Sequence, residues 1–91
     1  MSKNLNNLRD KIDSIDEEII QLLAKRMDAA IKIKTIKLKA GMATFDPSRE
    51  EKLKTRIKKL AAQNRLSEGF CLRLYELILV ESKRVQDSMG N

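Results

Sequence analysis

The sequence contains no histidine and no tryptophan, and its 91 residues include one cysteine, one proline and three glycines. The single cysteine, Cys71, cannot form a disulfide within the chain, which excludes a disulfide-stabilised scaffold. A zinc finger and a histidine-ligated metal centre are excluded because their ligands are missing. Catalysis by a serine or cysteine paired with histidine is excluded for the same reason.

Long apolar runs are also absent. The longest strictly apolar run covers residues 77–80, far short of the ~20 residues that span a bilayer. Residues 1–7 lack the apolar core of a signal peptide. The sequence therefore predicts a soluble, cytoplasmic protein with no membrane partner.

The longest segment without glycine or proline runs from Leu5 to Ala40, and Gly41 and Pro47 follow it. Steps of three and four residues between apolar side chains are typical of an amphipathic helix. We predict one helix over this segment, ended by the glycine and proline. Its apolar stripe comprises Leu5, Leu8, Ile12, Ile15, Ile19, Leu22, Ala29, Ile33 and Ile36, with Arg26 in place of one member.

Two shorter helices are predicted after the first. Asp46 is a favourable N-cap with Pro47 at the first helical position, and Asn64 is a plausible end. Ser67 is the predicted N-cap of the last helix, and residues 87–91 are expected to fray. Because no segment alternates as a strand does, the expected fold is all-α with three helices.

The first helix is too long for a compact chain. Its thirty-six residues would extend roughly 54 Å. A compact domain of residues 1–91 has a radius of gyration of about 12 Å, hence a diameter near 30 Å. The apolar stripe would therefore lie half bare, which predicts a two-fold homodimer. The alternative is a helix broken near Met27.

Polar residues interrupt the apolar faces. Arg26 and Lys37 lie on one face of the first helix, three turns apart. A single basic residue there could extend to solvent or pair with an acid, but two aligned cations favour an anion site. On the second helix Asp46, Arg49 and Glu50 share the apolar face, and on the third so do Ser82 and Gln86.

Simpler interpretations of these residues remain open. Asp46 could serve only as an N-cap, and Arg49 and Glu50 could pair on the surface. Ser82 and Gln86 could bond a neighbouring backbone. Taken together, the set predicts a pocket for a small ligand bearing carboxylates, and catalysis by orientation and electrostatic stabilisation.

The remaining basic residues do not form a nucleic-acid stripe. The net charge is +6, from 19 lysines and arginines and 13 acids, so weak attraction to polyanions is possible. Lys32, Lys34 and Lys39 nevertheless point in different directions around the first helix. We interpret these lysines as a solvated face and expect no nucleic-acid partner.

The polar positions resemble those of the all-helical class of chorismate mutases, in order and in spacing. The resemblance runs from about Leu5 to Gln86 without a gap and includes eight polar positions. The motifs that carry it are Leu8-Arg9-Asp10-Lys11-Ile12, Ile15-Asp16, Leu22-Leu23-Ala24-Lys25-Arg26, Lys37, Asp46-Pro47-Ser48-Arg49-Glu50, Glu81-Ser82 and Gln86.

The resemblance implies an intertwined all-α homodimer that converts chorismate to prephenate without metal or cofactor, toward phenylalanine and tyrosine. The absence of further domains in this chain suggests a single-function enzyme. Arg26 and Ser82 would bind one carboxylate, and Lys37 the other carboxylate and the ether oxygen. Gln86 would donate to that oxygen, Asp46 and Glu50 would bind the ring hydroxyl, and Arg49 would add positive charge near the ring carboxylate.

Arg9 would enter the site from the partner chain. It lies seventeen residues before Arg26, roughly 25 Å along one helix, so both cannot serve one small ligand from one chain. Three alternatives stay open: an isochorismate-pyruvate lyase on the same scaffold, rearrangement of an amino-substituted chorismate, and a non-enzymatic basic dimer that binds nucleic acid or an acidic partner. The last would tolerate changes at Ser82 and Gln86.

Overall fold

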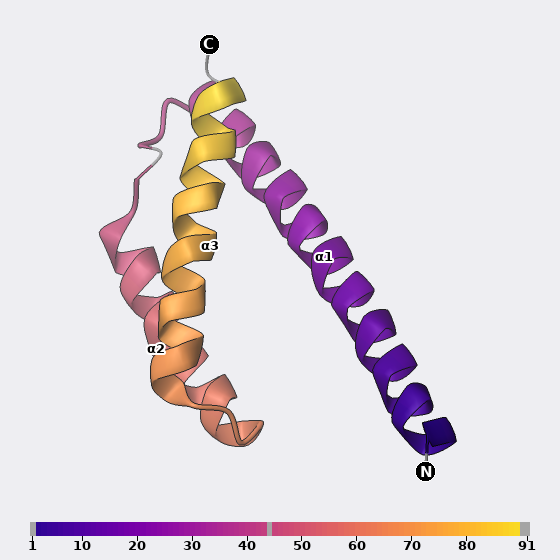
Figure 1. The fold of residues 1–91 in the computed structure, drawn as a ribbon. Helices are drawn as coiled ribbons and strands as arrows, with labels where there is room; N and C mark the ends of the chain where they lie inside the picture. Colours follow the sequence, from indigo (N-terminus) through magenta and orange to yellow (C-terminus); the bar gives the residue numbers. More distant parts are fainter. Residues whose placement is uncertain (1, 44, 90–91) are drawn as a thin grey trace.

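The computed structural model describes residues 2–43 and 45–89 and contains three helices, joined by short connections (Figure 1). They are α1 (Ser2–Lys39), α2 (Pro47–Gln63) and α3 (Glu68–Met89). The all-α class and the long first helix are confirmed. The alternative break near Met27 is wrong, because α1 continues through it.

The predicted caps lie at the helix ends. The carboxylate of Asp46 accepts hydrogen bonds from the backbone N–H groups of Ser48 and Arg49, at 3.1 and 3.2 Å. The hydroxyl of Ser67 accepts one from the N–H of Phe70 at 3.2 Å. These three bonds satisfy N–H groups that a helix leaves without partners in its first turn.

The end of α1 agrees with expectation, whereas the end of α3 differs from it. Gly41, just beyond α1, has a φ of 67°, the left-handed conformation that glycine adopts without strain. The frayed tail predicted from residue 87 is wrong as far as Met89, because α3 continues to that residue. Contacts of Gln86 and Asp87 with α1 hold this last turn in place. Residues 90–91 lie outside the described part of the chain.

Helix α3 packs against both other helices. Along α2 it buries a small core of Ile57, Ala61 and Cys71, with partly buried Leu53, Leu72 and Tyr75 around it. Helix α1 meets α3 over its C-terminal half, and its N-terminal half diverges from the other two helices (Figure 1). The chain is therefore elongated, with a radius of gyration of 17.0 Å and dimensions of 60 × 27 × 15 Å.

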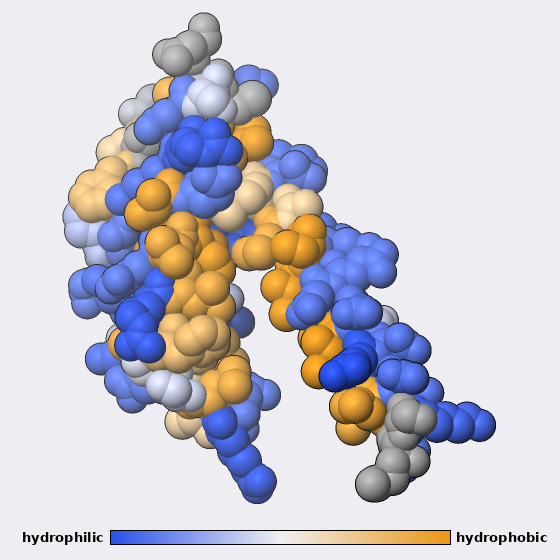
Figure 2. Space-filling model, in the orientation of Figure 1, coloured by the Kyte–Doolittle hydropathy of each residue, from blue (hydrophilic) through white to orange (hydrophobic). Residues whose placement is uncertain are grey.

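The N-terminal half of α1 leaves its apolar stripe uncovered. In Figure 2 a band of hydrophobic side chains follows the side of α1 that faces the open space beside α2 and α3. A helix normally buries such a stripe, so a single copy of this chain leaves the apolar surface of α1 exposed to water. The side chains are 44 to 61% exposed: Leu5, Leu8, Ile12, Ile15, Ile19 and Leu22.

The described helices contain no stretch long and apolar enough to cross a membrane.

Candidate functional site

A pocket of about 520 Å³ lies where the C-terminal half of α1, the start of α2 and the C-terminal half of α3 meet. Helical periodicity directs one face of each helix toward this place. Seven of the eight predicted polar residues line the pocket: Arg26, Lys37, Asp46, Arg49, Glu50, Ser82 and Gln86.

Arg26 is held from two sides. Its Nη1 donates a 2.8 Å hydrogen bond to the hydroxyl of Ser82, and its guanidinium carbon lies 5.8 Å from the centre of the Tyr75 ring. Ser82 is only 7% exposed and donates in turn to the carbonyl of Ile78 at 2.9 Å. Within the described part of the chain, no carboxylate lies within ion-pair distance of Arg26. The guanidinium group is therefore held in one orientation, and no acid among the described residues neutralises its positive charge.

Gln86 joins α3 to α1. Its side-chain Nε2 donates a 2.9 Å hydrogen bond to the carbonyl of Ala30. The simpler interpretation of Gln86, a bond to a neighbouring backbone, thus describes one of its contacts. A primary amide has two N–H groups and one oxygen, so a donor remains for a ligand in the pocket.

Two lysines of α1 line the pocket. Lys37 was predicted there, and Lys34 was not. The interpretation of Lys34 as part of a solvated face is wrong: its side chain is 13% exposed, and its Nζ lies 3.4 Å from Asp87, which is 81% exposed. Lys34 lies three residues before Lys37, at the edge of the same face, and this spacing could have indicated it.

Asp46 combines a structural contact with a place at the pocket. The backbone N–H of Arg49 chiefly lowers the pKa of its carboxyl group, with further contributions from Ser48 and from the charge of Lys37. Each of these groups stabilises the ionised form. The N-cap interpretation of Asp46 is therefore confirmed, and its carboxylate also lines the pocket.

The surface pair considered for Arg49 and Glu50 does not form among the described residues. Glu50 Oε1 instead lies 3.2 Å from the Nζ of Lys83 on α3. The same Nζ lies 4.9 Å from the centre of the Phe45 ring, within the range of a cation–π contact. Both Lys83 and Phe45 line the pocket, and no sequence pattern indicated either residue.

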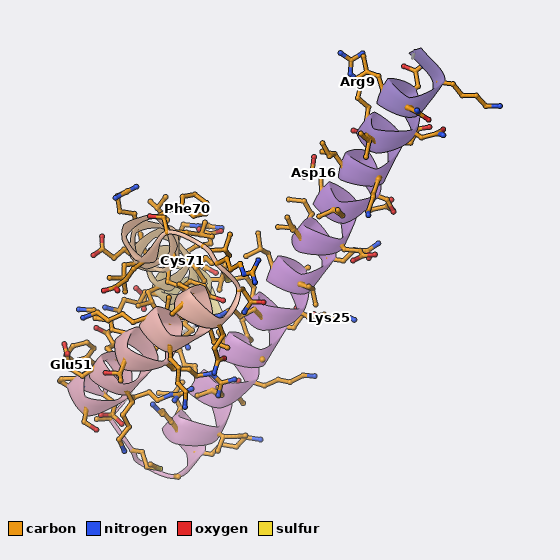
Figure 3. The ribbon with its side chains drawn as sticks, turned by 90° about the horizontal axis from the view of Figure 1, so that it is seen from below. Arg9, Asp16, Lys25, Glu51, Phe70 and Cys71 are labelled. Atoms are coloured by element: carbon orange, nitrogen blue, oxygen red, sulfur yellow. The ribbon has the colours of Figure 1, made fainter. Side chains whose placement is uncertain are left out.

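Arg9 is far from this pocket within one chain. It lies near the end of α1 that points away from α2 and α3 (Figure 3). The position of Arg9 in the structure agrees with its separation from Arg26 along the helix, which was calculated from the sequence. A role for Arg9 in the site thus requires a second chain.

The pocket carries more positive than negative charge. Its lining includes five cations, Arg26, Lys34, Lys37, Arg49 and Lys83, and three acids, Asp46, Glu50 and Asp87, a balance of +2. In the described ranges, no group of three or more potential ligands is arranged to hold a metal ion. The arrangement suits a small organic anion whose charge is matched by fixed side chains.

Comparisons with known proteins agree with this charge pattern. The family described as chorismate mutase type II matches residues 8–87. A chorismate mutase of Methanocaldococcus jannaschii is 31% identical over 86 residues, which are 94% of this chain and 87% of that protein.

Two further relatives differ in their named activity. A 4-amino-4-deoxychorismate mutase of Streptomyces venezuelae is 31% identical over 83 residues, 91% of this chain and 81% of that protein. A bifunctional chorismate mutase/prephenate dehydratase of Buchnera aphidicola is 36% identical over 91 residues, 99% of this chain but 24% of that protein.

Proposed function

Because the chain belongs to the type II chorismate mutase family and has chorismate mutase activity, we propose that the pocket between α1, α2 and α3 is its active site. The activity is an isomerase step in aromatic amino acid biosynthesis. One observation carries this proposal. Three helices bring seven predicted polar side chains to a single pocket with a balance of +2. A substrate with two carboxylates complements that charge.

Two cations of α1, three turns apart, bind the two carboxylates, each with a residue of another helix beside it. Arg26 and Ser82 bind one, and the guanidinium is already oriented by the hydroxyl at 2.8 Å. Lys37 binds the other, with Arg49 adding positive charge near the ring carboxylate. Fixing both ends holds the substrate in the folded shape in which its reacting carbons meet, and this lowers the entropic part of the barrier.

The ether oxygen is the centre of the chemistry. The rearrangement breaks one C–O bond and forms one C–C bond in the same molecule, and no atom is gained or lost. Negative charge develops on the ether oxygen as its bond breaks. Lys37 and the second N–H of Gln86 donate to this oxygen, and their interaction is stronger in the transition state than in the ground state.

The ring hydroxyl lies at the start of α2 in this proposal. Asp46 and Glu50 face it, and one of the two carboxylates accepts the hydrogen bond from its single O–H group. Asp46 is held by two backbone N–H groups and Glu50 by Lys83, so neither acid needs to move to receive the substrate. Fixed dipoles and charges of this kind act without reorganisation during the reaction.

A second copy of the chain completes the site. The exposed stripe of α1 is the support for an intertwined homodimer, because each large apolar side chain that goes from half exposed to buried contributes on the order of 1 kcal/mol. The dimer places the partner's Arg9 in the pocket, where it binds a carboxylate. Residues 1–91 as one catalytic domain and a cytoplasmic location remain predictions.

One assay tests the proposal against its main alternative. The purified protein is incubated separately with chorismate and with isochorismate, and the products are identified. Prephenate from chorismate is expected. Release of pyruvate from isochorismate, with chorismate unchanged, would support the lyase instead. A basic dimer that binds nucleic acid would convert neither compound.

A further inference from the structure

Lys83, like Lys34, is a pocket cation that the proposed mechanism does not use. It contacts Glu50 at 3.2 Å and faces the Phe45 ring at 4.9 Å. The ring and the carboxylate together restrict where the ammonium group lies. In this position Lys83 sets the charge that Glu50 presents to a ligand.

We propose that Lys83 selects a substrate with a neutral hydroxyl at ring carbon 4 and disfavours one with a charged amino group there. The inference rests on the proposed function, in which Glu50 and Asp46 face that substituent. Relatives named for chorismate and for 4-amino-4-deoxychorismate are both 31% identical to this chain, so the degree of identity alone does not identify the residue that discriminates between the two substrates.

The two substituents differ in charge and in hydrogen bonding. A hydroxyl is neutral and needs one acceptor, which an ionised Glu50 supplies even while it contacts Lys83, because a carboxylate has several acceptor positions. An amine on a saturated carbon is protonated at neutral pH. The resulting ammonium group requires a negative charge beside it, but the side chains that line the pocket already have a net charge of +2.

Among the described residues that line the pocket, Asp46 and Glu50 are the acids at the start of α2 that could compensate such an ammonium group. Lys83 neutralises much of the charge of Glu50, and it repels a second cation at the same carboxylate. The side chain of Lys83 is 54% exposed and that of Glu50 is 28% exposed, so water and salt weaken this repulsion without removing it. The expected discrimination is therefore moderate.

The test compares kcat/KM for chorismate and for 4-amino-4-deoxychorismate in four proteins. They are the wild type, Lys83→Met, Lys83→Arg and the control Lys59→Met. Lys59 is exposed on α2 and lies outside the pocket, and its substitution changes the net charge equally. We expect Lys83→Met to raise the ratio of the amino to the hydroxy substrate by about twofold to fivefold.

Salt dependence separates a charge effect from a structural one. The Debye length falls from about 30 Å at 0.01 M salt to about 8 Å at 0.15 M. The change in ratio caused by Lys83→Met should therefore be larger at low salt. Lys83→Arg, which keeps the charge, and Lys59→Met should leave the ratio close to that of the wild type.

Each other outcome counts against the proposal. An unchanged ratio in Lys83→Met, an equal shift in Lys59→Met, or a wild-type preference for the amino substrate would overturn the role of Lys83 while leaving the mutase activity intact. Turnover of neither compound by the wild type would instead overturn the proposed function, and this inference with it. If Lys83→Met does not fold, Lys83→Gln makes the same comparison with a neutral polar side chain.

Discussion

Gln86 Nε2 donates a 2.9 Å hydrogen bond to the backbone carbonyl of Ala30, which ties α3 to α1 within the pocket. The bond uses one of the two N–H groups of the amide and fixes the plane of the other. Gln86 can therefore support the fold and the reaction together. Substitutions at this position should separate the two contributions.

Gln86→Glu should lower kcat/KM at neutral pH by on the order of 10²-fold or more, comparable to the loss of one oxyanion-hole donor. An ionised glutamate accepts hydrogen bonds only, and it faces both the Ala30 carbonyl and an oxygen that is becoming negative. Protonation returns a single O–H donor, so activity should recover in part as the pH falls. Profiles of kcat/KM for variant and wild type from about pH 4.5 to 8 test this, a range that brackets an upward-shifted carboxyl group.

Gln63→Glu serves as the control, because it makes the same change on an exposed turn of α2. It should leave the profile unchanged. If the profiles of Gln86→Glu and wild type run parallel, Gln86 is a structural residue and leaves the list of catalytic groups.

Arg9→Ala and Arg26→Ala chains should each be nearly inactive alone. When they are mixed and refolded, each heterodimer would contain one intact site and one that lacks both arginines. Random pairing makes half of the dimers heterodimers, so about a quarter of wild-type activity should return. Proven heterodimers without activity would mean that Arg9 is structural or acts within its own chain.

Ile12→Lys should disrupt the dimer, because Ile12 lies on the exposed stripe of α1. Sedimentation at low micromolar concentration should show the wild type at twice the chain mass of 10.5 kDa. The variant should show loss of this species and of helical signal. Ser14→Lys places the same charge on the opposite face of α1 and should leave the dimer intact. A folded wild-type monomer would contradict the shared site.

Asp46→Asn should reduce the pH dependence of stability. Hydrogen bonds from the backbone N–H of Arg49 and from Ser48 lower the pKa of Asp46 in the folded chain. A lowered folded pKa means that the carboxylate stabilises the fold above the ordinary aspartate pKa of about 3.9. This contribution is lost as the pH falls through the lower folded pKa.

The wild type should therefore be more stable than Asp46→Asn at pH 7, and the two should converge in strong acid. Urea unfolding at a fixed protein concentration measures the difference at each pH. Glu51→Gln, in the second turn of α2, reports the general effect of removing one negative charge. A difference between wild type and Asp46→Asn that stays constant with pH would contradict the role of the N-cap charge.

Much of this architecture was accessible from sequence because it is local. A helix repeats every 3.6 residues, so the apolar stripe of α1 and the placement of Arg26 and Lys37 on the same face follow from counting. Asp46 and Ser67 marked helix starts because their oxygens satisfy N–H groups two or three residues away. The length of α1 likewise indicated that no compact single chain could cover it.

The partners of the polar groups depended on the tertiary structure. Glu50 contacts Lys83 and not Arg49, and Gln86 bonds the carbonyl of Ala30. Lys34 is mostly buried beside Asp87, and the same contacts keep the last turn of α3 helical. Periodicity defines the face on which a side chain lies, but a partner on another helix depends on how far the two helices are shifted and rotated against each other. That offset comes from the packing of all three helices, and no local pattern encodes it.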